Sequence, residues 1–502
     1  MDTSAYHSPF DGRYTSAEMN QIFSDDRKFS TWRRLWVALA KAEQALGLDI
    51  SDEQIAEMER YVDDINYNVA NAREREVRHD VMAHVYAFGQ QAKSAAGIIH
   101  LGATSCYVTD NTDILNLRDA IDLAYGKLLG VIKLLRDFAS AEKNSPILGS
   151  THYQPATPTT IGKRASLWLQ NFENNFEELK FVRSRLKMLG CRGATGSSET
   201  FMKLFHGNET KCKALDALIA AQFNFGIISR DSFDPDNIQA FDTDNARVFP
   251  VSGQTYPRNL DLQVINALAA IAASAYKMAQ DIRLLQHDKE IEEPFGKSQI
   301  GSSAMAYKRN PMRCERICSI AGYVSGLPIM AWRTAATQML ERTLDDSAGR
   351  RVYIPDAFRA TDAILRLCSN VTNGLVINRG IVAAHLEAEL PFMATEATIM
   401  KAVEKGADRQ VMHAKIRDYS MRLSRMVKNG EIPTNRVKEK MAFFIHDDPD
   451  IPLSCEDFYN LLDASKLIGR CPSQVDDYLN TVVDYLLLMN DDKIIIDSTV
   501  KV

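Results

Sequence analysis

The sequence predicts a mainly α protein built around a long central helical bundle, and three observations lead to that prediction. Apolar residues recur at three- and four-residue spacing over stretches longer than an ordinary globular helix. The longest stretch, residues 260–293, contains neither proline nor glycine. Period-two alternation is scarce, with only the tail IIIDSTVKV and a few short runs as strand candidates. Helices of such length are typical of a bundle or a coiled-coil-like core.

The first part of the chain predicts two shorter helices. The segment TWRRLWVALAKAEQALG, residues 31–47, repeats its apolar residues with helical spacing and ends at Gly47, a helix stop. In the following SDEQIAEMERYV, Ser51 and Gln54 have the spacing of a capping box. We therefore expect a second helix to begin there.

Three long helices are predicted further on, beyond Asn111 to about residue 140, over residues 165–189 and over residues 260–293. Gly126 and Gly130 fall inside the first of them, where small residues let another helix approach closely. Changes in pattern near the start of this helix and around residues 378–379 predict three domains. These are an amino-terminal helical domain (1–111), a central long-helix domain (112–378) and a carboxy-terminal helical domain (379–502).

Composition excludes several classes of protein. The 502 residues are 45% hydrophobic and 25% charged, unlike an intrinsically disordered scaffold. A formal charge of -6, from 59 Lys and Arg against 65 Asp and Glu, argues against a nucleic-acid binder, so an anionic ligand must be held by a few placed cations. The first residues lack a secretory signal, and no wholly apolar run is long enough to cross a membrane. We expect a cytoplasmic protein with no membrane partner.

The cysteine spacing and the absence of several motifs further restrict the reactions that this protein could catalyse. The eight cysteines are scattered without a CxxC pair, which suggests neither a disulfide framework nor a zinc ribbon. Cys314 and Cys318, one helical turn apart, are interpreted as buried thiols rather than half of a metal site. The sequence has no GxGxxG after a strand, no GxxxxGK[ST], no HExxH and no GxSxG. The sequence motifs therefore give no support to dinucleotide binding, P-loop NTP hydrolysis, zincin chemistry or α/β-hydrolase chemistry.

The most unusual polar segment is QIGSSAMAYKRNPMRCE, residues 299–315. Gly301, Ser302 and Ser303 form a small loop, while Lys308 and its neighbouring arginines lie beside the expected start of a helix. Such a loop can present a hydroxyl, backbone N–H groups and a positive charge to one anion. The alternative is a solvated, serine-rich connection.

Two histidines stand in polar surroundings. His152 lies in GSTHYQPATPTTIGKR, a proline-punctuated stretch between two helices, where we expect it to line a cleft. His79 lies in REVRHDVMAHV between Arg78 and Asp80, and an adjacent carboxylate can orient an imidazole. The alternative for a lone helix histidine is a surface or satisfied core residue.

Two further segments supply hydroxyls and cations. In HLGATSCYVTDN, Thr104 and Ser105 on a turn before the long helix suit either a carboxylate site or a helix cap. The segment ERTLDDSAGRR brings hydroxyl and guanidinium groups close together in the sequence and by itself indicates a charged helix face. The side chains concerned are those of Arg342, Ser347, Arg350 and Arg351.

Taken together, these segments resemble the fumarase/aspartase superfamily. GSSAMAYKRNP resembles its signature loop SSxMPxKxN, although Ala306 stands where the family usually has proline, which predicts a more mobile open loop. The segments HLGATSCYVTDNTD, THYQPATPTTIGKR, SGQTYPRN and ERTLDDSAGRR resemble the animal-type adenylosuccinate lyase family more than argininosuccinate lyase or fumarase. The resemblance runs from about Arg13 to beyond Glu389.

This resemblance implies a three-domain fumarase/aspartase-like fold and elimination of fumarate from a succinyl-nucleotide. A proton leaves the carbon beside a carboxylate while the departing nitrogen gains one. By family match Ser302 is the base, with Ser303 left open as its neighbour, His152 is the general acid, and His79 contacts the substrate beside Arg78 and Asp80. Lys308 and Asn310 support the serine when the loop closes.

The remaining positions that match the family are those expected to bind the negatively charged groups of the nucleotide substrate. Thr104, Ser105, Gln254 and Lys308 match positions around the succinyl group. Positions matching phosphate, ribose or carboxylate contacts are Arg13, Tyr14, Arg316, Arg342, Ser347 and Arg351. No metal or organic cofactor is implied. The family further implies a homotetramer whose central helices form one bundle and whose sites are shared between subunits.

Two other functions stay open at this point. Another superfamily lyase, such as argininosuccinate lyase, would share the signature loop but act on a substrate without phosphate. A non-catalytic structural homologue is the second possibility, against which the intact Ser302, His152, His79 and Lys308 argue.

Overall fold

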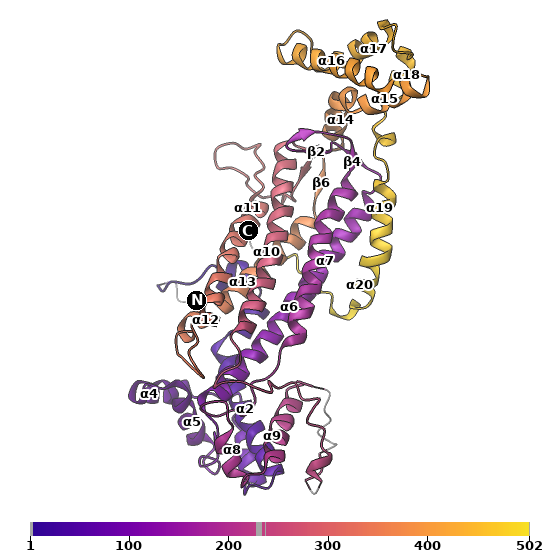
Figure 1. Cartoon of the computed structure of the whole chain (residues 1–502). Helices are drawn as coiled ribbons and strands as arrows, with labels where there is room; N and C mark the ends of the chain where they lie inside the picture. The colour runs from indigo at the N-terminus through magenta and orange to yellow at the C-terminus, as the bar shows by residue number, and fades with distance from the viewer. Residues whose placement is uncertain (1–3, 227–232, 236, 501–502) are drawn as a thin grey trace.

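The computed structural model describes residues 4–226, 233–235 and 237–500. Figure 1 shows an elongated molecule in which long helices run side by side, with a group of shorter helices at either end. This arrangement confirms the prediction of a mainly α protein with a long central bundle.

Six helices form the bundle: α6 (Ser105–Ala141), α7 (Ile161–Arg185), α10 (Asn259–His287), α11 (Met312–Ser325), α12 (Leu327–Ala336) and α13 (Ser347–Thr372). Their apolar stripes meet in one continuous core with those of the amino-terminal helices. α6 begins at Ser105, before the predicted start beyond Asn111. The prediction was late because the buried Asp110 and Asn111 interrupt the apolar pattern of its first turns.

α10 is long and apolar enough, by length and composition, to cross a membrane. More than half of its apolar stretch is buried inside the protein, where it packs against α7, α11, α12 and α13. α10 is therefore a core helix of the bundle. It ends at His287, earlier than the predicted residue 293, because β5 (Ile291–Glu292) pairs antiparallel with β6 (Val376–Ile377).

Shorter helices cover the end of the bundle where α6 begins (Figure 1). They are α2 (Asp25–Ala45), α3 (Asp52–Arg60), α4 (Tyr67–Val77), α5 (Asp80–Gln91), α8 (Glu199–Leu204) and α9 (Glu209–Gln222). The π-helical turn η1 (Phe10–Tyr14) packs against α13, and α1 (Ala17–Ile22) packs against α6 and α13. The Ser51 and Gln54 capping box is present as predicted. Gly47, with φ +95°, follows the end of α2.

At the other end, two short antiparallel pairs connect α6 to α7. β1 (Pro146–Ile147) pairs with β4 (Thr159–Thr160), and β2 (Ser150–Thr151) pairs with β3 (Gln154–Pro155).

Beyond this end lies a group of helices with its own apolar core: α14 (Arg379–Met393), α15 (Thr395–Glu404), α16 (Arg409–Lys428), α17 (Val437–Asp447) and α18 (Cys455–Tyr459). The chain then returns along the bundle through α19 (Cys471–Tyr478), the π-helical turn η6 (Leu479–Val483) and α20 (Asp484–Leu488), drawn yellow in Figure 1.

The tail corrects two predictions. Residues 494–500 form no strand, and the last two residues of the predicted strand lie outside the described residues. The tail lies against α6, and a helix offers no ladder of free backbone groups for pairing. Gly126 and Gly130 make room for this tail rather than for another helix. A Cβ atom would lie 2.6 Å from the Lys493 carbonyl oxygen at Gly126 and 2.1 Å from the Ile495 carbonyl oxygen at Gly130.

Candidate active site

The first turns of α5 and α6 bring His79 and Ser105 together. His79 caps α5 by accepting the Met82 N–H at Nδ1 (3.4 Å), and its Nε2 lies 3.3 Å from the Ser105 hydroxyl oxygen. Because Nδ1 accepts, a neutral His79 carries its proton on Nε2 and donates it. Thr104 occupies the N-cap position of α6, as the alternative of a helix cap predicts, but its side chain makes no capping hydrogen bond.

Asp80 and Arg351 extend this arrangement. The Arg351 guanidinium lies 3.1 Å from the Asp80 carboxylate, and Arg78 has a left-handed backbone with φ 55° that turns the chain from α4 into α5. Lys28, which sequence reasoning missed, has its pKa lowered by burial and by the nearby charge of Arg351.

Gln254 and Arg342 join the same region from two loops. The Cys106 thiol donates to the Gln254 side-chain oxygen (3.6 Å), and the Gln254 backbone N–H donates to the Glu341 carbonyl (3.1 Å). Arg342 bonds Asp346 (2.8 Å), just before Ser347 opens α13. We call the following residues the α6 amino-terminal cluster: His79, Asp80, Thr104, Ser105, Gln254, Arg342 and Arg351.

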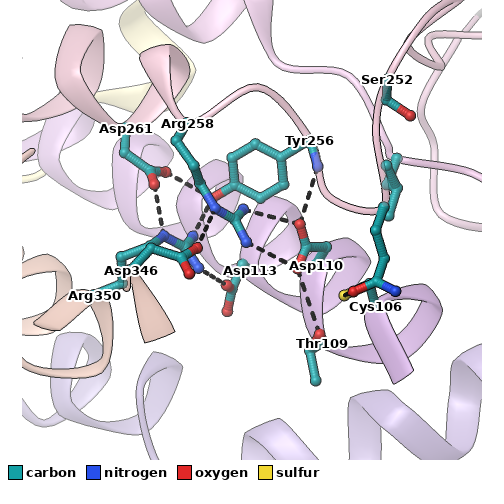
Figure 2. A network of polar contacts seen from close by, with 12 residues as sticks. Cys106, Thr109, Asp110, Asp113, Ser252, Tyr256, Arg258, Asp261, Asp346 and Arg350 are labelled. Carbon is teal, nitrogen blue, oxygen red and sulfur yellow. Dashed lines mark hydrogen bonds and ion pairs between the residues drawn. The ribbon is translucent and has the colours of Figure 1, made fainter. Parts of the chain in front are cut away.

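Figure 2 shows a buried network of charges, which the Arg342–Asp346 bond joins to this cluster. Arg258 reaches Asp110 on α6 (2.9 Å) and Asp346 before α13 (2.6 Å). Arg350 reaches Asp261 on α10 (2.7 Å), whose other oxygen accepts the Tyr256 hydroxyl (2.6 Å). The network thus ties α6, α10 and α13 together beneath the cluster.

Sequence reasoning missed this network. It singled out only Arg342 and Arg350, as part of a charged face, and for Arg350 that alternative is wrong because Arg350 is buried. The available signal was a set of carboxylates inside long apolar helices, since a buried charge requires a partner. Burial raises the pKa of Asp346, but the charges of Arg258, Arg342 and Arg350 outweigh that effect and hold its pKa below the ordinary value.

A second group lies around Tyr14. The guanidinium carbons of Arg13 and Arg316 lie 5.7 Å and 5.4 Å from the centre of the Tyr14 ring. Nη1 of Arg316 is buried and has no hydrogen-bond partner among the described residues, so it can still receive an anion. A groove of about 470 Å³ lies over α13 and is lined by both Asp11 and Arg351.

The signature loop closes on itself. The Asn310 amide donates to the Gly301 carbonyl (2.8 Å), and a Cβ atom at Gly301 would lie 2.0 Å from the Lys308 carbonyl oxygen. The Ser302 hydroxyl oxygen accepts the N–H groups of Ala304 (3.3 Å) and Met305 (3.1 Å). Ser303 and Lys308 are exposed in the same loop, as the alternative of a solvated connection predicts, while the bonds of Ser302 and Asn310 tie parts of its backbone together.

His152 lies apart from these groups. It occupies the turn between β2 and β3 with a left-handed φ of 52°, and its side chain is exposed. α6 has 37 residues, so at 1.5 Å per residue it separates the α6 amino-terminal cluster from the β2–β3 turn by roughly 55 Å. Within one chain His152 cannot meet His79.

The described parts of the chain contain no arrangement of side chains ready to bind a metal ion. No group of three or more His, Cys, Asp or Glu side chains there is placed to hold a metal ion. Cys314 and Cys318 are both buried on α11, as predicted.

Comparison with known proteins identifies this fold and its family. The family model described as "Lyase" matches residues 12–223 and 236–326, and that described as "Adenylosuccinate lyase C-terminus" matches residues 391–478. Among solved structures, the 3-carboxy-cis,cis-muconate lactonizing enzyme from Pseudomonas putida superposes with a TM-score of 0.79 at 23% identity, covering 95% of this chain and 99% of that one. The fold is that of the helical lyases.

Curated relatives define the family more narrowly. Adenylosuccinate lyase from Saccharomyces cerevisiae is 44% identical over 98% of this chain and 99% of its own length. Adenylosuccinate lyase from Schistosoma mansoni is 39% identical over 99% of both chains. The chain belongs to the adenylosuccinate lyase family.

Proposed function

We propose that the protein releases fumarate from two substrates of purine biosynthesis. It cleaves adenylosuccinate to AMP and fumarate, and succinylaminoimidazole carboxamide ribotide to aminoimidazole carboxamide ribotide and fumarate. The observation that carries this proposal is similarity to adenylosuccinate lyases over almost the full length of both chains. Both reactions are β-eliminations that break a C–N bond, so one site with one base and one acid serves both substrates.

Ser302 is the proposed base. A serine hydroxyl ionises with difficulty near neutral pH, so the alkoxide needs stabilisation. The N–H groups of Ala304 and Met305 already donate to its oxygen and would strengthen their bonds as it becomes negative. Lys308 and Asn310 add a positive charge and an anchor for the loop. Ser303 stays the alternative because it is the immediate neighbour.

His152 is the proposed general acid, which protonates the departing nitrogen. Its exposed position at the tip of a two-residue hairpin suits a group that acts in a site completed by another subunit. His79 contacts the substrate through Nε2, with Asp80 and Arg78 holding its turn.

The cations and hydroxyls divide between two anionic parts of the substrate. Thr104, Ser105, Gln254 and Lys308 would hold the succinyl carboxylates. The residues proposed for phosphate, ribose and carboxylate contacts are Arg13, Tyr14, Arg316, Arg342, Ser347 and Arg351. No cofactor takes part in this proposal, because side chains supply both the proton acceptor and the proton donor.

We further propose a cytoplasmic homotetramer with shared sites. The helix separation requires His152 and the α6 amino-terminal cluster of one site to come from different chains. Large apolar side chains are exposed along α12 and the turn that follows it, as in an oligomer interface. They include Ile329, Trp332, Met339 and Leu340.

The direct test is to incubate the purified protein with adenylosuccinate and with argininosuccinate and to follow fumarate by absorbance. The proposal expects fumarate and AMP from the first substrate and none from the second. Release from argininosuccinate alone would assign another superfamily activity. Release from neither substrate would favour a non-catalytic homologue.

A further inference from the structure

The tail of the chain forms a strap along the bundle. We call residues 493–500 the C-terminal strap. The Ile495 N–H donates to the Gly126 carbonyl on α6 (2.9 Å). Two side chains of α13 bind its backbone: Asn370 donates to the Ser498 carbonyl (2.7 Å) and Arg366 to the Thr499 carbonyl (2.5 Å). The strap therefore spans α6 and α13.

Asp497 is the one acidic residue of the strap, and it lies between two cations. Its carboxylate is 3.2 Å from Lys127 Nζ on α6 and 2.7 Å from Arg366 Nε on α13. Lys127, only 3% exposed, also bonds the fully buried Asp362 (2.5 Å). Two cations and two carboxylates thus balance in a place where an unpaired charge is costly.

Two of these charged residues, Arg366 and Asp362, also bind the backbone of the segment that carries Tyr14. Arg366 donates through Nη1 to the Tyr14 carbonyl (2.7 Å). Asp362 accepts the backbone N–H of Ser16 (2.7 Å) and its hydroxyl (3.1 Å). The segment that carries Arg13 and Tyr14 is therefore fixed by residues whose own positions depend on Asp497.

We propose that Asp497 is a positioning residue for the anion-binding segment of Arg13 and Tyr14. It acts through Arg366 and Lys127 and touches no substrate. Without its charge, Arg366 and Lys127 compete for Asp362, and the Tyr14 carbonyl and Ser16 N–H lose their fixed partners. The part that concerns substrate affinity rests on the function proposed above for Arg13 and Tyr14.

The kinetic test compares Asp497→Asn with wild type on adenylosuccinate. Loosening a binding segment while the base and acid stay in place predicts a KM about five- to tenfold higher with kcat nearly unchanged, about the net worth of one hydrogen bond. Asp497→Glu should restore most of the affinity. Asp492→Asn, an exposed carboxylate of the same tail, is the matched control and should behave as wild type.

A second readout does not depend on turnover. Hydrogen exchange measured by mass spectrometry should show faster exchange in peptides covering residues 10–20 of Asp497→Asn, and not of Asp492→Asn. If wild type lacks lyase activity, the proposed function fails while the exchange result still decides the role of the strap. If Asp497→Asn does not assemble, Asn370→Ala removes one strap bond, keeps all four charges and should shift both readouts in the same direction.

Three outcomes would overturn the inference. They are unchanged exchange in residues 10–20, a lowered kcat with unchanged KM, and an equal effect of the Asp492→Asn control.

Discussion

Ser302 differs from its neighbour Ser303 in the hydrogen bonds that its side-chain oxygen accepts. Two backbone N–H groups converge on the Ser302 oxygen, so the loop is built to stabilise negative charge at that atom. We predict that Ser302→Ala lowers kcat at least about a hundredfold, as expected for loss of a general base, with the assembly intact. Steady-state kinetics and native mass spectrometry check both parts. If Ser303→Ala is the inactive variant instead, the base is the neighbouring residue.

Glu43 is a buried residue outside the proposed site, and both its carboxyl oxygens lack hydrogen-bond partners among the described residues. Burial raises its pKa to about 9. An unfolded Glu ionises near its ordinary pKa, so between that value and 9 folding binds a proton. The contribution of Glu43 is fully present at low pH and is lost as pH rises, by up to about 1.4 kcal/mol per pH unit.

We therefore predict that Glu43→Gln, which keeps the shape without the charge, stabilises the protein increasingly as pH rises. Melting temperatures of the two proteins should nearly coincide near about pH 5 and diverge by about pH 8, with the variant higher. Parallel melting profiles across this range would show that Glu43 is already ionised in the folded protein.

At the scale of elements, the buried charges hold three long helices together. Asp346 receives both Arg258 and Arg342, so neutralising it leaves two arginines competing for the remaining carboxylates. We predict that Asp346→Asn destabilises the protein by about 3 kcal/mol, the usual cost of breaking a buried ion pair. Denaturant unfolding measures the loss. Asp345→Asn, one residue away and exposed, should change stability little, and an equal effect of the two would contradict a special role for the network.

Sequence periodicity predicted the long helices because their apolar stripes are continuous, and it failed where polar groups are buried. The start of α6 was missed at Asp110, whose carboxylate is satisfied by Arg258 from a distant loop. Gly126 and Gly130 indicated that another segment packs closely against this helix, but they could not indicate which one. The segment that does so is the tail, which lies hundreds of residues away in the sequence. The candidate site residues came from motif resemblance. The predicted helix lengths already implied that some of them lie far apart, whereas the contact between His79 and Ser105 became visible only in three dimensions.

At the scale of the whole molecule, the elongated bundle carries its proposed catalytic groups at opposite ends. His79 and Ser105 lie where α6 begins, whereas His152 and the signature loop lie near the ends of α6 and α10. A rigid bundle cannot fold back to join them. The site proposed above is therefore complete only if a neighbouring subunit contributes to it, and the exposed apolar side chains of α12 offer a surface for such a neighbour.

Subunit complementation tests this shared-site account most directly. His79→Ala and His152→Ala should each be nearly inactive alone, and equal amounts should be mixed under conditions in which native mass spectrometry verifies subunit exchange. If the two histidines of one site come from different chains, about one site in four of the hybrids has both intact, and about a quarter of wild-type activity returns. Activity that stays at the level of the separate variants after verified exchange would mean that one chain supplies both histidines, and would contradict the account.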